Sequence, residues 1–106
     1  MKKTDCIIIE IPIVLELELI TIKSNRKDMR VNENIKPISC VYFLYDEYKQ
    51  LQYIGESGNV RMRLHWHLAY GCTPTFVRIF PVSNKYDRKA IENLLIKKYQ
   101  PLKNII

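Results

Sequence analysis

The strongest constraint on the fold is a pair of short β-type runs separated by a polar turn. Residues 41–45 read VYFLY and residues 51–55 read LQYIG, with DEYKQ at 46–50 between them. β-branched and aromatic side chains favour extended backbone, and a short polar connection between two such runs is typical of a β-hairpin. The sequence therefore predicts two neighbouring antiparallel strands.

A helix is predicted directly after this hairpin. Ser57 or Asn59 can cap its amino end, and Gly71 stops it. Its apolar residues lie one turn apart along the side that we expect to be buried, at Val60, Leu64 and Leu68.

A third strand and a second helix complete the pattern. The strand covers residues 76–82, Asp87 caps the following helix, and Pro101 ends it. The apolar stripe of this second helix comprises Ile91, Leu94, Leu95 and Tyr99. The order β-β-α-β-α over residues 38–106 predicts an α+β domain, with a small, mostly antiparallel three-stranded sheet flanked by helices.

Residues 1–37 are expected to form an N-terminal β-strand extension and a linker. Apolar residues occupy the odd positions from Ile7 to Leu19, which indicates a strand with one apolar face. Pro12 cannot donate a ladder hydrogen bond, so the segment is either an edge strand or two shorter strands. It either completes the sheet of the domain, which is the favoured interpretation, or pairs two copies into a homodimer. Residues 24–37 are polar and are interpreted as a linker or an irregular loop.

Charge and cysteine content narrow the class of protein. The 106 residues include 17 Lys and Arg against 11 Asp and Glu, and this surplus of +6 favours a polyanionic partner, nucleic acid before a membrane. Glutamates and Pro12 interrupt the apolar N-terminal run, which excludes a transmembrane helix and a secretory signal. Three widely spaced cysteines support neither a disulfide framework nor a zinc site, so we expect a cytoplasmic protein.

Five residues are candidates for catalysis, although each of them alone is also compatible with a structural role. Tyr42 and Tyr53 lie on opposite arms of the predicted hairpin and could sit close together. Arg63 and His67 are four residues apart, so they share one face of the first helix. Glu92 lies at the margin of the apolar stripe of the second helix.

Taken together, these residues resemble the motifs of the GIY-YIG nuclease family. Residues 40–42 (CVY) and 53–55 (YIG) match its two tyrosine motifs in order, and Arg63 and His67 follow at the matching distances. The closing motif of the family corresponds to Glu92, Pro101 and Asn104. The resemblance covers the whole predicted domain and departs from the family pattern at Cys40, which replaces the first glycine.

The resemblance implies a role for each of these residues. Tyr42 would be the general base that activates a water molecule, and Arg63 would bind the scissile phosphate. Glu92 would hold one divalent metal ion, Mg²⁺ or Mn²⁺. The other catalytic positions would be Tyr53 and His67. The positions that support the site would be Gly55 and Asn104.

These roles are chemically consistent with hydrolysis of a phosphodiester. A guanidinium is a permanently charged, bidentate partner for a phosphate, and a metal ion neutralises further negative charge. Glu92 is the only acid within the motif set, which favours one metal ion over two. Tyrosine is a weak base at its ordinary pKa of about 10, and a nearby cation would lower that pKa. The resemblance thus implies a metal-dependent DNA endonuclease, and the alternative is a catalytically silent nucleic-acid binding module with the same fold.

The expected partner is DNA, either double-stranded or branched. Contacts with the phosphate backbone are expected from basic side chains. These are Arg61, Arg63, Arg78, Lys85, Arg88 and Lys97. Trp66 and Tyr70 can either stack on an unpaired base or pack in the core or at its edge, and packing is the favoured interpretation.

Overall fold

The computed structural model describes residues 14–25, 30–70 and 74–104 of the chain. In chain order its elements are η2 (Val14–Glu16), β1 (Ile20–Thr21), β2 (Ser24–Asn25), β3 (Arg30–Val31), β4 (Cys40–Tyr45), β5 (Leu51–Ser57), α1 (Val60–Ala69), β6 (Phe76–Pro81), α2 (Lys85–Tyr99) and η3 (Leu102–Asn104). The succession β4-β5-α1-β6-α2 is the predicted β-β-α-β-α order.

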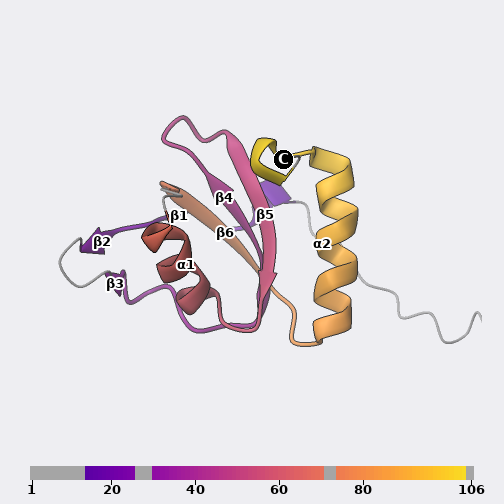
Figure 1. Ribbon diagram of the computed structural model, residues 1–106, viewed down its shortest axis with the longest axis horizontal. Helices are drawn as coiled ribbons and strands as arrows, with labels where there is room; N and C mark the ends of the chain where they lie inside the picture. Colours follow the sequence, from indigo (N-terminus) through magenta and orange to yellow (C-terminus); the bar gives the residue numbers. More distant parts are fainter. Residues whose placement is uncertain (1–13, 26–29, 71–73, 105–106) are drawn as a thin grey trace, which may run out of the picture.

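Four of the described strands form an open antiparallel sheet in the order β1-β6-β4-β5 (Figure 1). Strands β4 and β5 are the predicted hairpin, and β6 pairs with the other side of β4. Strand β1 pairs with β6, with Ile20 opposite Val77 and Thr21 opposite Phe76. The predicted α+β fold is confirmed. The sheet has one strand more than the three expected, because a segment that precedes the predicted domain joins its edge.

Strand β4 is buried on both faces and forms the centre of the molecule. All six of its residues are buried, and successive side chains point to opposite faces of the sheet. Figure 1 shows α1 and the small β2–β3 hairpin on one side of the sheet and α2 on the other. A strand that is covered on both faces has no solvated positions, which explains the uninterrupted apolar and aromatic run of β4.

Two hydrophobic cores result, one on each face of the sheet. The α1-side core comprises Val31, Ile35, Cys40, Tyr42, Leu44, Val60, Leu64 and Val77. The α2-side core comprises Val14, Val41, Phe43, Tyr45, Ile54, Ile91 and Leu95. Both cores therefore contain residues from the first 37 positions of the chain as well as from the predicted domain.

The strand expected over residues 7–19 is not formed where the structure describes that segment. Residues 7–13 lie outside the described residues, and the chain from Val14 forms the 3-10 turn η2. Val14 is buried, whereas Leu15 is 78% exposed. A turn closed by a 3.1 Å hydrogen bond from the Leu17 N–H to the Val14 carbonyl does not place alternate residues on one face. Pairing of two copies through the N-terminal segment stays a prediction.

Within the segment 24–37, expected to be a linker or an irregular loop, the described residues 24–25 and 30–37 include two short paired strands and two buried side chains. Strand β2 pairs antiparallel with β3, and Val31 and Ile35 are buried in the α1-side core. Arg61 on α1 holds this segment, because its guanidinium donates to the carbonyl oxygens of Val31, Asn32 and Ile35, each at 2.9 Å. These hydrogen bonds go to backbone carbonyls and do not depend on the side chains of residues 31–35. The sequence of that segment therefore could not predict them.

Helix α1 begins at one of its two predicted caps. Asn59 precedes its first residue, and the Asn59 side-chain oxygen accepts a hydrogen bond from the Met62 N–H at 3.1 Å. The predicted stop at Gly71 lies outside the described residues. Val60 and Leu64 are fully buried, as the apolar spacing indicated.

Helix α2 begins two residues before the predicted cap at Asp87. The cap is Asn84, whose side-chain oxygen accepts from the N–H groups of Tyr86 (2.8 Å) and Asp87 (3.1 Å). The predicted cap was wrong because both residues are good caps and only the backbone conformation selects one of them. Of the predicted stripe, Ile91 and Leu95 are buried, but Leu94 and Tyr99 are exposed, because the sheet covers a narrower face of the helix than the stripe spans. In the described part of the chain, no helix combines the length and apolar character that crossing a bilayer requires.

Candidate active site

Three aromatic side chains from three elements meet beside strand β5. Tyr42 comes from β4, Tyr53 from β5 and His67 from α1. The Tyr42 hydroxyl lies 2.9 Å from Nε2 of His67, and this hydrogen bond is buried. The Tyr53 ring lies against both, with ring centroids 6.1 Å from Tyr42 and 5.2 Å from His67. The hairpin and the helix thus bring together three of the five predicted catalytic residues.

Gly55 makes this arrangement of tyrosines possible. It lies directly opposite Tyr42 in the β4–β5 pairing and two residues after Tyr53, so all three residues face the same side of the sheet. A Cβ atom at Gly55 would lie 2.5 Å from the hydroxyl oxygen of Tyr42 and 2.7 Å from Cε2 of Tyr53. Both rings occupy the space of the missing side chain, so a supporting role for Gly55 has a steric basis.

Burial makes both members of the Tyr42–His67 pair prefer their neutral forms. Burial raises the pKa of Tyr42 well above its ordinary value, Tyr53 raises it further, and the positive charge of Arg63 opposes this shift. Burial also lowers the pKa of His67 to about 4, helped by the charges of Arg63 and Lys103. At neutral pH the imidazole is therefore uncharged, and one of its nitrogens is a hydrogen-bond acceptor.

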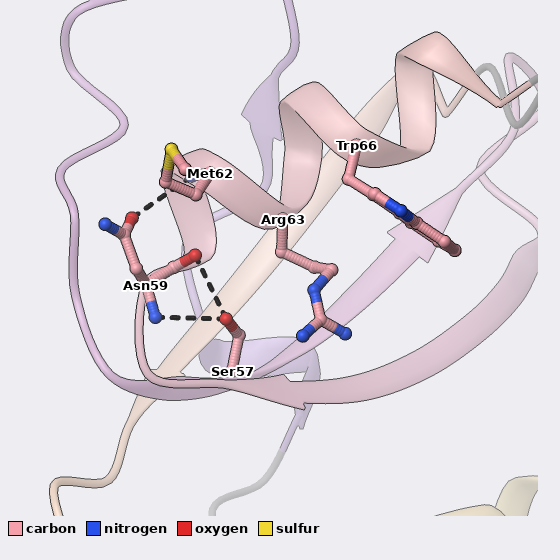
Figure 2. A pocket seen from close by; sticks show the side chains of 5 residues that line it. All are labelled: Ser57, Asn59, Met62, Arg63 and Trp66. Atoms are coloured by element: carbon pink, nitrogen blue, oxygen red, sulfur yellow. Dashed lines mark hydrogen bonds between the residues drawn. The ribbon is translucent and has the colours of Figure 1, made fainter.

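Arg63 lies on the solvent side of this cluster, at a pocket between α1 and the end of β5. The pocket has a volume of about 620 Å³ and is lined by Ser57, Asn59, Met62, Arg63 and Trp66. Figure 2 shows the Arg63 side chain extending from α1 toward Ser57 at the end of β5. Because Arg63 is exposed and several polar groups line the pocket, an anion could bind here next to a guanidinium.

Glu92 belongs to a second group of charges, on the α2 side of the sheet. The Lys89 ammonium lies 3.6 Å from a carboxylate oxygen of Glu92 and 3.6 Å from one of Glu56. Glu56 also accepts a 2.9 Å hydrogen bond from Nε of Arg88. Glu56 stands opposite Val41, which belongs to the α2-side core, whereas Gly55 faces the tyrosines. Strand β5 therefore carries aromatic site residues on one face and Glu56 on the other. Glu56 and three side chains of α2 form what we call the acidic group: Glu56, Arg88, Lys89 and Glu92.

The acidic group is suited to a cation. The side chains of Glu56 and Glu92 are each only 14% exposed, and a single ammonium lies between them. Burial raises the pKa of Glu92, with a further contribution from the charge of Glu56, while Lys89 lowers it. Burial also raises the pKa of Glu56, but the hydrogen bond from Arg88 and the charges of Lys89 and Arg88 outweigh this and lower it overall.

The number of carboxylates in the acidic group limits how many metal ions it could bind. Among the described residues, no three His, Cys, Asp or Glu side chains gather in a group that could hold a metal. Mg²⁺ commonly uses one or two protein carboxylates and keeps several water ligands. Glu92 and Glu56 could therefore supply at most two protein ligands to one such ion, with water completing its coordination.

Asn104 closes the outer edge of strand β5. Its side-chain oxygen accepts from the Ile54 N–H at 2.8 Å, and its side-chain nitrogen donates to the Ile54 carbonyl at 2.9 Å. The amide group thus takes the place of a neighbouring strand at the residue next to Gly55. Pro101 is fully buried, and Gln100 before it adopts a left-handed conformation (φ 45°) that turns the chain from α2 toward β5.

Cys40, the residue that stands where the family pattern has glycine, has a packing role. It is fully buried in the α1-side core, and burial raises the pKa of its thiol to about 12. Among described residues other than glycine, a positive φ occurs only at Lys49 and Gln100, so the backbone at Cys40 does not require glycine. The substitution therefore does not distort the strand that carries Tyr42.

Three of the arginines expected to contact DNA are engaged within the protein. Arg61 holds the segment before β4, as described above. Arg78 donates to the Tyr45 hydroxyl at 3.1 Å and to the carbonyls of Leu15 and Leu17. Arg88 is 7% exposed and donates to Glu56 and to two backbone carbonyls. The exposed cations of the predicted set are Arg63, Lys85 and Lys97.

Sequence reasoning left two residues of the acidic group without a role. Lys89 was not considered, although it lies three residues before Glu92 on one helix, a spacing at which opposite charges pair. Glu56 lies outside the residues that match the family motifs, so the sequence assigned it no role. Its position directly after the YIG motif could have placed it on the opposite face of the strand from Gly55.

Comparisons with known proteins support the fold. Two solved structures of the GIY-YIG N-terminal endonuclease domain of UvrC from Thermotoga maritima align with the chain at TM-score 0.54, with 23% and 22% sequence identity. Each alignment covers 74% of this chain and 91% of the other, and both structures are tyrosine-to-phenylalanine point mutants bound to a catalytic divalent cation. No protein-family model and no curated protein matches the sequence. The chain thus has the fold of a GIY-YIG endonuclease domain, as the sequence resemblance implied.

Proposed function

We propose that the protein is a metal-dependent endonuclease that hydrolyses phosphodiester bonds of DNA. The observation that carries this proposal is the buried 2.9 Å hydrogen bond between the Tyr42 hydroxyl and His67. His67 lies one helical turn after Arg63 on α1, and the Arg63 guanidinium lines a pocket open to solvent. A buried hydroxyl with a proton acceptor behind it, next to an exposed phosphate-binding cation, supplies the groups that water attack on a phosphodiester requires.

The proposed step uses Tyr42 as the general base with His67 behind it. A water molecule attacks phosphorus and transfers a proton to the Tyr42 oxygen, while the Tyr42 proton passes to Nε2 of His67. The new phosphorus–oxygen bond forms as the bond to the leaving sugar oxygen breaks. The sugar oxygen takes up a proton from solvent water, and His67 returns its extra proton to solvent. Burial raises the pKa of Tyr42 and lowers that of His67, so neither the phenolate nor the imidazolium would accumulate. In a concerted transfer the imidazolium would exist only during the attack, beside the negatively charged phosphate.

Arg63 would bind the phosphate that is attacked. Its charge persists at every pH that the fold survives, and its planar guanidinium can contact two phosphate oxygens at once. Negative charge grows on these oxygens during the attack, so Arg63 would stabilise the transition state more than the bound substrate. A group speeds up the reaction only when it stabilises the transition state more than the substrate.

Glu92, with Glu56 beside it, would hold one divalent ion, Mg²⁺ or Mn²⁺. The support is a pair of shielded carboxylates that already share one cation, the Lys89 ammonium. Strand β5 is at the edge of the sheet, so a phosphodiester that crosses this edge could face Arg63 from one side and an ion at these carboxylates from the other. When bound, such an ion would supply charge neutralisation on the phosphate and on the leaving oxygen. The two UvrC domain structures, each bound to a catalytic divalent cation, support the use of a divalent ion by this fold.

A nicking assay on supercoiled plasmid with Mg²⁺ or Mn²⁺ tests the proposal. We expect the wild type to nick the plasmid and EDTA to abolish nicking. Tyr42→Phe and Glu92→Gln should each reduce the rate by at least about a hundredfold, because each removes a group that acts on the reacting atoms. DNA affinity of Tyr42→Phe, measured by fluorescence anisotropy, should stay near that of the wild type.

The matched control is Glu33→Gln, which removes an exposed carboxylate elsewhere on the surface and should leave the rate unchanged. Retained turnover in Tyr42→Phe would contradict the general-base role. Binding without cleavage by the wild type on plasmid, linear and branched DNA would instead favour the alternative, a nucleic-acid binding module with the same fold.

A further inference from the structure

We propose that Trp66 and Tyr70 form a stacking platform for an unpaired nucleobase of the DNA strand whose phosphate lies at Arg63. This inference deepens the proposed function and rests on it, since it names the substrate class: DNA with unpaired bases next to the cleavage point. Single-stranded, gapped or branched DNA would then be preferred over continuous duplex.

The first observation is that both rings are largely exposed, so of the two expected kinds of packing only packing at the edge of the core remains. Trp66 is 53% exposed and Tyr70 is 73% exposed, although both side chains are large and largely apolar. Their ring centroids lie 5.1 Å apart at an interplanar angle of 44°. The two rings make one continuous aromatic surface at the carboxyl end of α1, where Tyr70 is the cap residue, and no described element covers this surface.

The second observation is that this surface is continuous with the candidate active site. The Trp66 ring contacts the edge of the His67 ring, with centroids 5.2 Å apart, and His67 bonds the Tyr42 hydroxyl. The Arg63 guanidinium lies 5.9 Å from the centroid of the Trp66 ring. Figure 2 shows Arg63 and Trp66 on the same side of α1, both lining the pocket.

The chemistry of these groups selects one kind of ligand. A guanidinium binds a phosphate, and an indole next to it offers a flat apolar face for a base of the same nucleotide or its neighbour. The pocket volume of about 620 Å³ is in the usual range for small-ligand sites and can receive a nucleotide. In a continuous duplex each base is already stacked between its neighbours, so only an unpaired base can use the platform without the cost of leaving the stack.

The single tryptophan of the chain provides a direct measurement. Its emission reports on Trp66 alone, and a stacked base quenches indole fluorescence. The full-length protein is titrated in EDTA, where no cleavage occurs, with a short oligothymidylate, a duplex of the same length and an abasic oligomer of the same length. We expect strong quenching by the oligothymidylate and little quenching by the duplex or by the abasic oligomer.

Variants test the platform by anisotropy of a labelled oligothymidylate. Trp66→Ala should weaken its binding roughly 5- to 100-fold, and Trp66→Phe should restore most of the loss, because stacking on an aromatic ring contributes on that scale. Duplex binding should change much less in both variants. Tyr86→Ala, which removes an 84% exposed ring from α2, is the matched control and should bind like the wild type. Thermal unfolding of each variant verifies that it is folded.

Two results would overturn the inference. One is oligothymidylate binding without a change in Trp66 emission, and the other is an equal loss of single-strand and duplex binding in Trp66→Ala. Because no step of this experiment involves cleavage, quenching by a protein that never nicks DNA would support the platform and contradict the proposed function. Nicking without quenching would do the reverse.

Discussion

At the scale of single residues, the candidate active site depends on a hydrogen bond between two buried groups that both stay neutral. Burial disfavours the phenolate of Tyr42 and the imidazolium of His67. The free protein therefore holds the proton on tyrosine with an acceptor 2.9 Å away. Arg63 is the nearby charge that favours the phenolate, and a substrate that displaces water from the pocket would strengthen its effect.

The lowered pKa of His67 predicts how stability depends on pH. The pKa is about 4 in the folded protein against an ordinary 6.5, so the unfolded chain binds more protons between these values. The contribution of this group to the free energy of unfolding is therefore complete above about pH 6.5 and is lost as the pH falls toward 4. The loss should be on the order of 3 kcal/mol, from 1.36 kcal/mol for each of the 2.5 pH units.

The measurement is urea unfolding at several pH values for the wild type and for His67→Gln. The glutamine retains hydrogen-bonding groups but does not titrate, so the difference in unfolding free energy between the two proteins should shrink as the pH falls. Parallel curves would contradict the lowered pKa of His67.

A second prediction at this scale concerns the two described glycines around the end of β5. Gly55→Ala places a Cβ 2.5 Å from the Tyr42 hydroxyl oxygen, so a tyrosine ring must move. We expect a loss of about 1–3 kcal/mol in the free energy of unfolding, as for other overpacked sites, and a nicking rate reduced more than tenfold. Denaturant unfolding and the plasmid assay measure these two effects.

Gly58→Ala is the matched control for this prediction. The nearest atom to a Cβ at Gly58 is a guanidinium nitrogen of Arg88 at 3.8 Å, which is ordinary contact. Its stability should lie within about 0.5 kcal/mol of the wild type. Equal effects of the two substitutions would mean that steric support of the tyrosines is not the role of Gly55.

At the scale of elements, strand β5 organises the site because each of its sides serves a different group. One face carries Tyr53 and Gly55, the other carries Glu56, and its outer edge receives the Asn104 side chain. Both helices contact this strand, so Arg63 and His67 on α1 and Glu92 on α2 reach it from opposite faces. A displacement of β5 would therefore affect the aromatic cluster and the acidic group together.

Asn104→Ala should loosen the edge of β5. The substitution removes two hydrogen bonds to the Ile54 backbone, at an expected cost of about 1–2 kcal/mol, since water can partly replace them. Hydrogen exchange of the Ile54 amide should accelerate, and nicking should slow because Gly55 is the next residue. Asn93→Ala, at an exposed position on α2, is the control. Unchanged protection of the Ile54 amide in Asn104→Ala would contradict the role assigned to this side chain.

At the scale of the whole molecule, the positive charge of the chain is divided between two tasks. The surplus of +6 indicated a polyanionic partner. Arg61, Arg78 and Arg88 instead connect segments of the protein through backbone carbonyls and Glu56. Arg61 in particular attaches the segment that contributes Val31 and Ile35 to the α1-side core. These guanidiniums hold residues 15–17, residues 31–35 and α2 to the rest of the fold, and the exposed cations remain for the proposed DNA partner.

The salt dependence of DNA binding separates the two tasks. Lys97→Gln should reduce the slope of log affinity against log salt by about 1 while leaving stability unchanged, if Lys97 contacts a phosphate. Arg61→Gln should leave that slope unchanged and lower the free energy of unfolding by about 2–3 kcal/mol, because it deprives part-buried carbonyls of their donor. A changed slope with unchanged stability in Arg61→Gln would restore Arg61 as a DNA contact.

The sequence by itself determined the features that arise from short-range patterns. Alternation and β-branched residues located the β4–β5 hairpin, a one-turn spacing located α1, and the tyrosine motifs identified residues that the structure places together. The sequence did not predict β1 or the burial of Val31 and Ile35 in the α1-side core. A two-residue strand and isolated apolar positions in a polar segment have no periodicity that could reveal them.

Only the tertiary structure decided the properties that depend on what packs against a side chain. The sequence does not show whether an arginine donates to a backbone carbonyl or faces solvent, so it could not distinguish the roles of Arg61 and Arg63. The neutral state of His67 and the exposure of Trp66 likewise follow from neighbours distant in sequence. Desolvation depends on the neighbours that the fold brings together, so the protonation states in the candidate site follow only from the tertiary structure.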